Sequence, residues 1–98
     1  MSINTKPFDA ADYLETDEDI AGYLTEALAT HDTAVITRAL GAVARARGMT
    51  RIARETGLSR ESLYRALSAE GNPEFATVLR IIEAIGLRLA VEPSSKVA

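Results

Sequence analysis

The feature that most constrains this chain is a short segment, residues 50–67, in which small and polar residues are spaced as two helices joined by a tight turn require. Ala53 leaves room for a second helix to cross the first, and Gly57 can adopt the positive φ with which a chain reverses direction in few residues. Ser59 then offers a side-chain oxygen to cap the second helix. The segment therefore predicts two short helices that meet at a steep angle.

Apolar residues elsewhere in the chain also recur with the period of an α-helix. Ile20, Leu24 and Leu28 follow one another at steps of four. Only 5% of the residues are aromatic and alanine is abundant, which favours close-packed helices over a sheet. We expect an all-α fold of five helices, over residues 17–29, 33–47, 49–56, 58–67 and 73–85.

The two ends of the chain lack this helical period. Residues 1–15 indicate an N-terminal arm with a single helical turn, while Leu87, Leu89 and Val91 alternate with other residues and predict a short β-strand over residues 87–91. A lone strand has an unpaired edge, so we expect it to pair with the same strand of a second subunit or with a strand of a partner. Pairing with the N-terminal arm of the same chain is the alternative.

Length and composition exclude several classes of protein. With 98 residues, 47% of them hydrophobic, the chain is expected to form one domain over residues 1–98. It has no cysteine and one histidine, His31, and Ser59 and Ser62 have no histidine base near them in the sequence, so we expect no metal site, no cofactor and no enzymatic activity. The chain shows neither an export signal nor an apolar run approaching about 20 residues, which predicts a cytoplasmic protein without a membrane segment.

Charge is divided unevenly along the chain. Residues 1–32 carry one lysine and eight acids, net −7, whereas residues 33–65 carry seven arginines and two glutamates, net +5. Residues 66–98 carry three bases and four acids, net −1. Such a division indicates a middle segment that meets an anion and an N-terminal segment that meets a cation, or simply two segments that face each other.

The basic middle segment contains the two-helix motif. If Leu63 faces the core, a rotation of 100° per residue points Glu61 and Arg65 outward and leaves Arg60 in the first turn, where a helix inserted by its N-terminal end meets base edges. Arginine pairs with guanine, and glutamate can accept a hydrogen bond from cytosine. The segment therefore predicts a DNA-reading helix-turn-helix, with an ordinary helical hairpin as the alternative.

Longer stretches of the sequence resemble a known family. Residues 39–50, 57–68 and 71–78, with residues 8–14 upstream and 84–89 downstream, are similar to the HigA-type probable addiction module antidote proteins of bacteria. The resemblance implies a five-helix, Xre-like and lambda-repressor-like DNA-binding domain that acts as a homodimer. It also implies that the protein neutralises a RelE/HigB-like ribonuclease toxin and binds operator DNA to repress their shared operon.

The same resemblance assigns the contacts with DNA. The residues at base-facing positions of the motif are Ser59, Arg60, Glu61 and Arg65. The residues at positions expected to meet phosphates are Thr50, Arg51, Tyr64 and Asn72. Arg54 does not come from the resemblance; it is expected to contribute salt-dependent affinity for phosphates through its charge. Arg51 departs from the glutamine or glutamate often found at its position, although a phosphate contact is natural for arginine.

The acidic N-terminal segment offers a second contact surface. Asp17, Glu18 and Asp19 are expected to bind the basic surface of the toxin. Their alternative role is local, because acids at the start of a helix interact favourably with its dipole. Two other functions stay open: a stand-alone Xre-like repressor without a toxin, and a protein-interaction module whose helix-turn-helix does not bind DNA.

Overall fold

The computed structural model describes residues 9–68 and 70–94, and within these ranges it contains one short 3-10 helix and five α-helices. The elements are η1 (Ala10–Tyr13), α1 (Asp17–Ala29), α2 (Thr33–Arg47), α3 (Met49–Thr56), α4 (Arg60–Ala66) and α5 (Phe75–Ile85). The predicted all-α arrangement of five helices is confirmed over these residues, as is the single helical turn of the N-terminal arm. No helix in the described ranges combines the length and apolarity that crossing a membrane requires.

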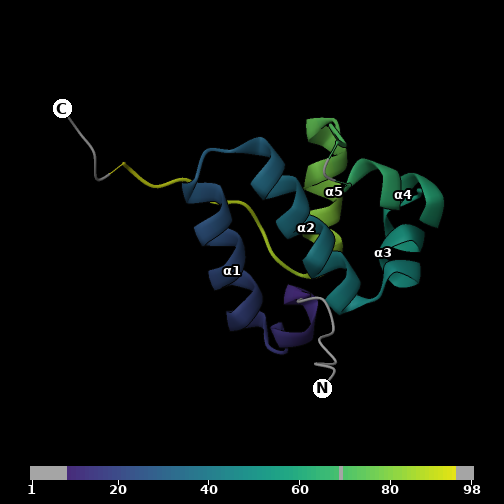
Figure 1. Cartoon of the computed structure of the whole chain (residues 1–98), viewed down its shortest axis with the longest axis horizontal. Coiled ribbons are helices and arrows are strands. Elements are labelled where there is room, and N and C mark those ends of the chain that lie inside the picture. Colours follow the sequence, from purple (N-terminus) through teal and green to yellow (C-terminus); the bar gives the residue numbers. More distant parts are fainter. Residues whose placement is uncertain (1–8, 69, 95–98) are drawn as a thin grey trace, which may run out of the picture.

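Helix α2 lies at the centre of the arrangement (Figure 1). It contacts η1 and α1 on one side and α3 and α5 on the other. Helix α3 packs in turn against α4 and α5, so that α3 and α4 form the end of the molecule opposite α1 (Figure 1). The two-helix segment predicted from the sequence is therefore presented at one end of the fold.

The core draws on all five α-helices. Each contributes a side chain that is at most 1% exposed: Ile20, Val43, Ile52, Leu63 and Ile81. These belong to one cluster of buried apolar side chains, which follow the helical stripes seen in the sequence. Leu28 is an exception, since its four-residue spacing put it on the buried stripe of α1 but its side chain is 44% exposed near the end of that helix.

Local sequence explains where helices begin and end. The Thr16 hydroxyl accepts the Asp19 N–H at 3.0 Å and the Asp19 carboxylate accepts the Thr16 N–H at 3.1 Å, a reciprocal cap at the start of α1. Asp32 caps α2, and His31 occupies the turn before it with a φ of 59°. Gly86 ends α5 in the left-handed conformation, with a φ of 99°.

Two predicted boundaries need correction. Helix α5 begins at Phe75 instead of Pro73, because residues 71–74 form the loop that leads into it. Helix α4 covers Arg60–Ala66, shorter than the predicted residues 58–67, since Ser59 is its cap and Leu58 belongs to the turn.

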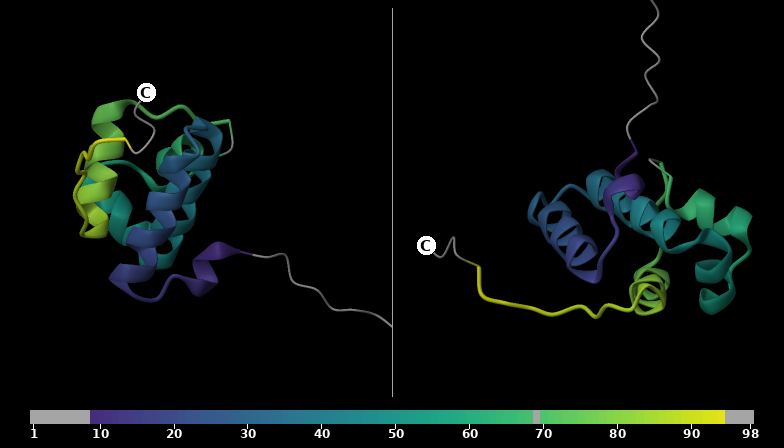
Figure 2. Two further views of the ribbon diagram at one scale, coloured as in Figure 1. Left: turned by 90° about the vertical axis from the view of Figure 1, so that its left-hand side faces the viewer. Right: turned by 90° about the horizontal axis from the view of Figure 1, so that it is seen from below.

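The predicted strand over residues 87–91 is not formed. Residues 87–94 have no regular secondary structure and run as an open segment from the end of α5 past α1 (Figure 2). We call residues 87–94 the C-terminal arm. Only hydrogen bonds to a neighbour turn an alternating sequence into a strand, and no described segment supplies them. Pairing with the N-terminal arm is not seen for residues 9–15, and residues 1–8 lie outside the described part of the chain.

Candidate nucleic-acid interface

Helices α3 and α4 are joined by a tight turn of three residues, 57–59. Gly57 is left-handed, with φ 81° and ψ 8°. The backbone N–H groups of Gly57 and Leu58 both donate to the Ala53 carbonyl, at 3.0 and 3.1 Å. Ala53 is 4% exposed and Leu63 is fully buried, so the inner faces of the two helices are packed into the core. The opposite face of α4 is left in solvent.

Ser59 stands at the tip of α4. Its hydroxyl oxygen accepts the Ser62 N–H at 3.0 Å and lies 3.0 Å from the Ser62 hydroxyl. The serine therefore caps the helix, as its position predicts, and one lone pair of its hydroxyl is left for an outside donor.

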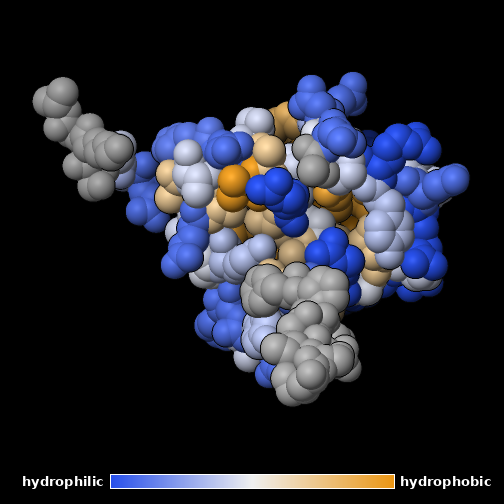
Figure 3. Space-filling view, in the orientation of Figure 1, coloured by the Kyte–Doolittle hydropathy of each residue, from blue (hydrophilic) through white to orange (hydrophobic). Residues whose placement is uncertain are grey.

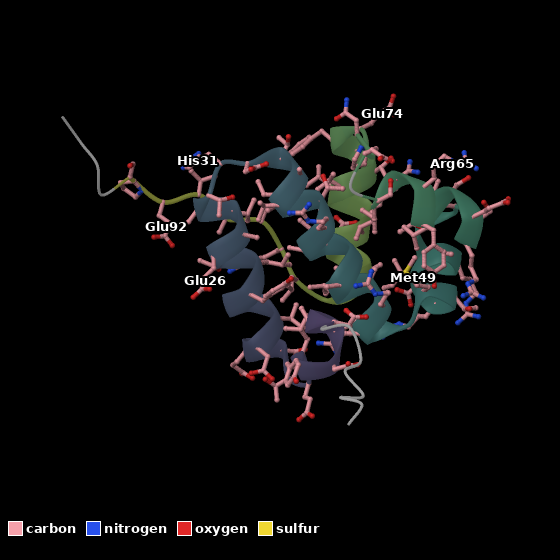
Figure 4. The ribbon with its side chains drawn as sticks, in the orientation of Figure 1. Glu26, His31, Met49, Arg65, Glu74 and Glu92 are labelled. Atoms are coloured by element: carbon pink, nitrogen blue, oxygen red, sulfur yellow. The ribbon has the colours of Figure 1, made fainter. Side chains whose placement is uncertain are left out.

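The other three predicted base-facing residues, Arg60, Glu61 and Arg65, are exposed on α4. The Arg60 guanidinium lies 5.7 Å from the centroid of the Tyr64 ring, and its Nη2 is 3.4 Å from the Tyr64 hydroxyl. Arg65 points outward from the upper side of α4 (Figure 4). Hydrophilic side chains gather over this end of the molecule (Figure 3).

An open groove that sequence analysis missed adjoins this face. It has a volume of about 440 Å³, and Arg65 and Asn72 both line it. Gly71 forms part of its wall, because a Cβ there would lie 2.1 Å from the Ala66 carbonyl oxygen. The loop before α5 thus brings Asn72, a predicted phosphate contact, to the side of α4 that carries Arg65. The sequence Gly71-Asn72-Pro73 marked a loop but not its close approach to α4.

Arg51 is held away from that groove. Its Nε lies 3.2 Å from a Glu55 carboxylate oxygen, and its Nη2 donates to the Ala84 carbonyl at 3.5 Å. Ala84 is near the end of α5, whereas Asn72 precedes its start, and a helix of 11 residues is about 16 Å long. The structure therefore separates two residues that were both predicted to meet phosphates.

Thr50 and Arg54 lie one helical turn apart on α3, and both are exposed. Arg54 forms no ion pair with any acid in the described ranges. Its positive charge is thus available to a ligand, unlike that of Arg51.

Two further arginines of the basic middle segment are neutralised within the chain. Arg45 Nη2 lies 2.8 Å from a carboxylate oxygen of Asp9, and Arg47 forms an ion pair with Asp17. The hydrogen bond from Arg45, together with the Ala11 N–H, holds the pKa of Asp9 below its ordinary value, and the same bond raises the pKa of Arg45. The acidic and basic segments face each other here, one of the two arrangements that the charge division allowed.

The three acids predicted to bind a toxin have different surroundings. Asp17 is paired with Arg47, and the Asp19 carboxylate accepts the backbone N–H groups of Thr16 and Glu15, which lower the pKa of Asp19. Glu18 is exposed and pairs with no base in the described ranges. Two of the three acids thus have a local structural role. Within the same ranges, no group of three acids or histidines is placed to hold a metal ion.

Comparison with known proteins places the chain in a family. The family model described as "Probable addiction module antidote protein" matches residues 4–93. The chain belongs to this family. A relative from Haemophilus influenzae, described as an uncharacterized protein, is 47% identical over 94 residues, which cover 96% of this chain and 97% of the relative. No solved structure matches the chain. Family membership gives the antidote a role in a toxin–antitoxin pair.

Proposed function

We propose that this antidote is a HigA-type, Xre-like antitoxin: a homodimer that neutralises a RelE/HigB-like ribonuclease toxin and represses their operon by binding its operator DNA. The observation that carries the DNA-binding part is the exposed face of α4, where Arg60, Glu61 and Arg65 stand outside the tight turn at Gly57. The observation that carries the toxin-binding part is membership in the antidote family.

The face of α4 suits the major groove. Arg60 and Glu61 occupy the first turn of the helix, and Arg65 follows one turn later. About 7.5 Å along the helix axis separates Arg60 from Arg65, the length of about two base steps. Arginine donates two hydrogen bonds to guanine O6 and N7, and glutamate accepts one from cytosine N4. These side chains would set sequence preference, while Asn72 and Arg54 would position the backbone.

The placement of charge limits how strongly one protomer can bind DNA. The chain as a whole carries −3, and Arg45, Arg47 and Arg51 are each paired with an acid. Arg54, Arg60 and Arg65 remain on α3 and α4 without an acidic partner in the described ranges. Three cations and one short recognition helix give low affinity and read few base pairs. A dimer doubles the number of cations and reads two half-sites, whose centres lie one helical turn of about 34 Å, or a multiple of it, apart.

A protein-interaction module is the second candidate, and the pairing of three arginines with acids favours it. Neutralisation of three arginines within an acidic chain is also what a scaffold that does not bind DNA would show. A stand-alone repressor without a toxin is the third candidate, and a reading frame for a small basic protein beside this one would exclude it.

A gel shift on the region upstream of the coding sequence separates the first two candidates. It would be run with purified antidote at about 50 and 200 mM salt, in the presence of unrelated competitor DNA. A shift that resists competitor and weakens with salt supports the repressor. Arg65→Ala should weaken binding by about 1–3 kcal/mol and relax the preference at one base pair. Arg80→Ala, a charge-matched change on the exposed side of α5, should not change the preference. The absence of a shift at low salt would favour the protein-interaction module, whose helix-turn-helix does not bind DNA.

A further inference from the structure

The backbone of the C-terminal arm is open between Leu87, which is tied to α5, and Pro93. At one end the Leu87 N–H donates to the Ile82 carbonyl at 3.1 Å, and Leu87 packs against the core. At the other end Pro93 has no N–H to donate. Between them, no backbone group of residues 88–92 has a hydrogen-bond partner in the described part of the chain. Five consecutive residues are thus open to pair with another strand.

The side chains of this stretch are exposed as well. Leu89 is 41% and Val91 98% exposed, although both are apolar. Arg88 and Glu92 are exposed and form no ion pair within the described ranges. Glu92 lies on the arm beyond α1, at the end of the molecule opposite Arg65 (Figure 4). Exposed apolar residues beside open backbone are a site for strand addition.

We propose that residues 88–92 pair with the same residues of a second copy of this chain, as an antiparallel ladder whose two-fold axis passes between the two Ala90 residues. In this register Arg88 lies opposite Glu92 of the other copy, and Leu89 lies opposite Val91. The two-fold axis creates each of these pairs twice.

In this register every side chain of residues 88–92 lies opposite a compatible side chain of the other copy. Residues directly opposite each other in an antiparallel ladder project to the same face, and faces alternate along the strand. One face therefore carries the two Leu89–Val91 pairs. The other face carries two Arg88–Glu92 ion pairs with the small Ala90 pair between them. Leu87 and Pro93, which would form the next pair, cannot both donate, so the ladder ends there.

Other registers lose these pairs. A parallel ladder in register would place Arg88 opposite Arg88 and Glu92 opposite Glu92, and like charges directly opposite are destabilising. An antiparallel shift by one residue would place Arg88 opposite Val91. Charge complementarity thus favours a second copy in one register.

The ladder forms away from the recognition helix. The arm leaves the fold on the side of α1, opposite α4 (Figure 1), so pairing would leave both α4 faces free. Five residues form only a short two-stranded ladder, and such ladders are weak by themselves. We therefore expect an equilibrium between monomer and dimer that shifts with concentration. The inference supplies an interface for the homodimer of the proposed function.

Charge exchange tests the register by sedimentation equilibrium of the antidote alone. Arg88→Glu and Glu92→Arg should each raise the dimer dissociation constant by about tenfold, because each creates two like-charge pairs per dimer. The double variant with both changes should restore the wild-type constant. An equal mixture of the two single variants should also restore it, since each supplies the charge that the other lacks. A monomeric wild type, or single variants that dimerise like wild type, would overturn the proposal.

Cross-linking tests the axis independently, because the chain has no cysteine of its own. The two Ala90 Cα atoms would lie about 4.5–5.5 Å apart, within disulfide range, so Ala90→Cys should form a covalent dimer under mild oxidation. Glu92→Cys is the control, because its two copies would lie about 14 Å apart. Efficient cross-linking of the control, or none at position 90, would overturn the register. Neither experiment contains DNA or toxin, so its outcome is separate from that of the gel shift.

Discussion

The Arg60 guanidinium lies over the Tyr64 ring, 5.7 Å from its centroid, on the exposed face of α4. Arg60, which the sequence predicts to face bases, is thus in contact with Tyr64, which it predicts to meet a phosphate. The ring restricts a long and otherwise mobile side chain, which reduces the entropy lost when that side chain is ordered on DNA. Under the proposed function, this contact would hold Arg60 ready for DNA.

Removing the ring should uncouple this pair. We expect Arg60→Ala to weaken operator binding by about 1–3 kcal/mol. Tyr64→Ala should weaken binding as well, and the coupling energy between the two changes should be about 0.5–1 kcal/mol, as for an exposed cation–π pair. Tyr64→Phe, which keeps the ring, is the control and should retain most of the coupling. Fluorescence anisotropy on the double-mutant cycle measures this, and strictly additive effects would contradict the prepared geometry.

The salt dependence of DNA binding should distinguish Arg51 from Arg54. If Arg54, Arg60 and Arg65 all release counterions in a dimer, the slope of log K against log salt concentration should be no steeper than about −5. Arg54→Ala should reduce that slope by about 2 per dimer. Arg51→Ala should leave the slope unchanged and instead lower the midpoint of urea unfolding, because Arg51 ties α3 to α5. A reduced slope for Arg51→Ala would restore its predicted phosphate contact.

Much of the fold could be predicted because it is encoded locally. Caps such as Thr16 and Asp32 and the turn at Gly57 act within a few residues, so their sequence signals survive in the structure. The predicted strand over residues 87–91 failed because alternation fixes only which side chains share a face. Hydrogen bonds to a second strand must come from elsewhere, and no described segment of this chain offers them.

The candidate site was predictable where residues share one helix. Arg60, Glu61 and Arg65 are exposed on α4, as the helical period required. Contacts between distant segments were not predictable. The pairing of Arg51 with the Ala84 carbonyl, and the groove that brings Asn72 beside Arg65, depend on how helices pack, which one sequence does not specify.

Three glycines should respond differently to alanine. Gly57→Ala should destabilise the fold by about 1–2 kcal/mol, because alanine is strained at a φ of 81° although nothing crowds its Cβ. Gly71→Ala should cost more, since its Cβ would lie 2.1 Å from the Ala66 carbonyl oxygen, and it should also displace Asn72. Gly22→Ala is the control in open space on α1, and it should stabilise by about 0.5–1 kcal/mol. Urea unfolding gives all three values, and equal effects would contradict the geometry.

The Asp9–Arg45 ion pair predicts how stability depends on pH. The pKa of Asp9 is lowered in the fold, chiefly by its hydrogen bond from Arg45. The folded state therefore binds a proton less readily than the unfolded chain, in which aspartate titrates near about 3.9. The contribution is present above that pH and is lost as the pH falls through the lower, folded pKa.

Substitution of Asp9 tests whether this stabilisation is lost, as expected, when the pH falls. The melting temperature of Asp9→Asn should lie below that of wild type at about pH 6, and the two should converge as the pH falls below about 4. Asp12→Asn, which removes an acid without an ion-pair partner in the described ranges, is the control. A carbon NMR titration should also show the pKa of Asp9 rising in Arg45→Ala. If the difference in melting temperature between wild type and Asp9→Asn instead grows as the pH falls, the pKa of Asp9 is not lowered in the fold.

Binding of the toxin offers the last test, because the three predicted acids of α1 differ in whether they also have a structural role. Asp17 and Asp19 have structural roles, so reversing their charge would disturb the fold as well as any interface. Glu18→Lys changes an exposed acid that has no ion-pair partner in the described ranges. If α1 meets a basic surface of the toxin partner, we expect this change to weaken calorimetric binding of that toxin by about 1 kcal/mol or more. Glu26→Lys, an exposed acid further along α1 (Figure 4), controls for net charge. Equal affinities for Glu18→Lys and wild type would leave the acids only their local role at the start of α1.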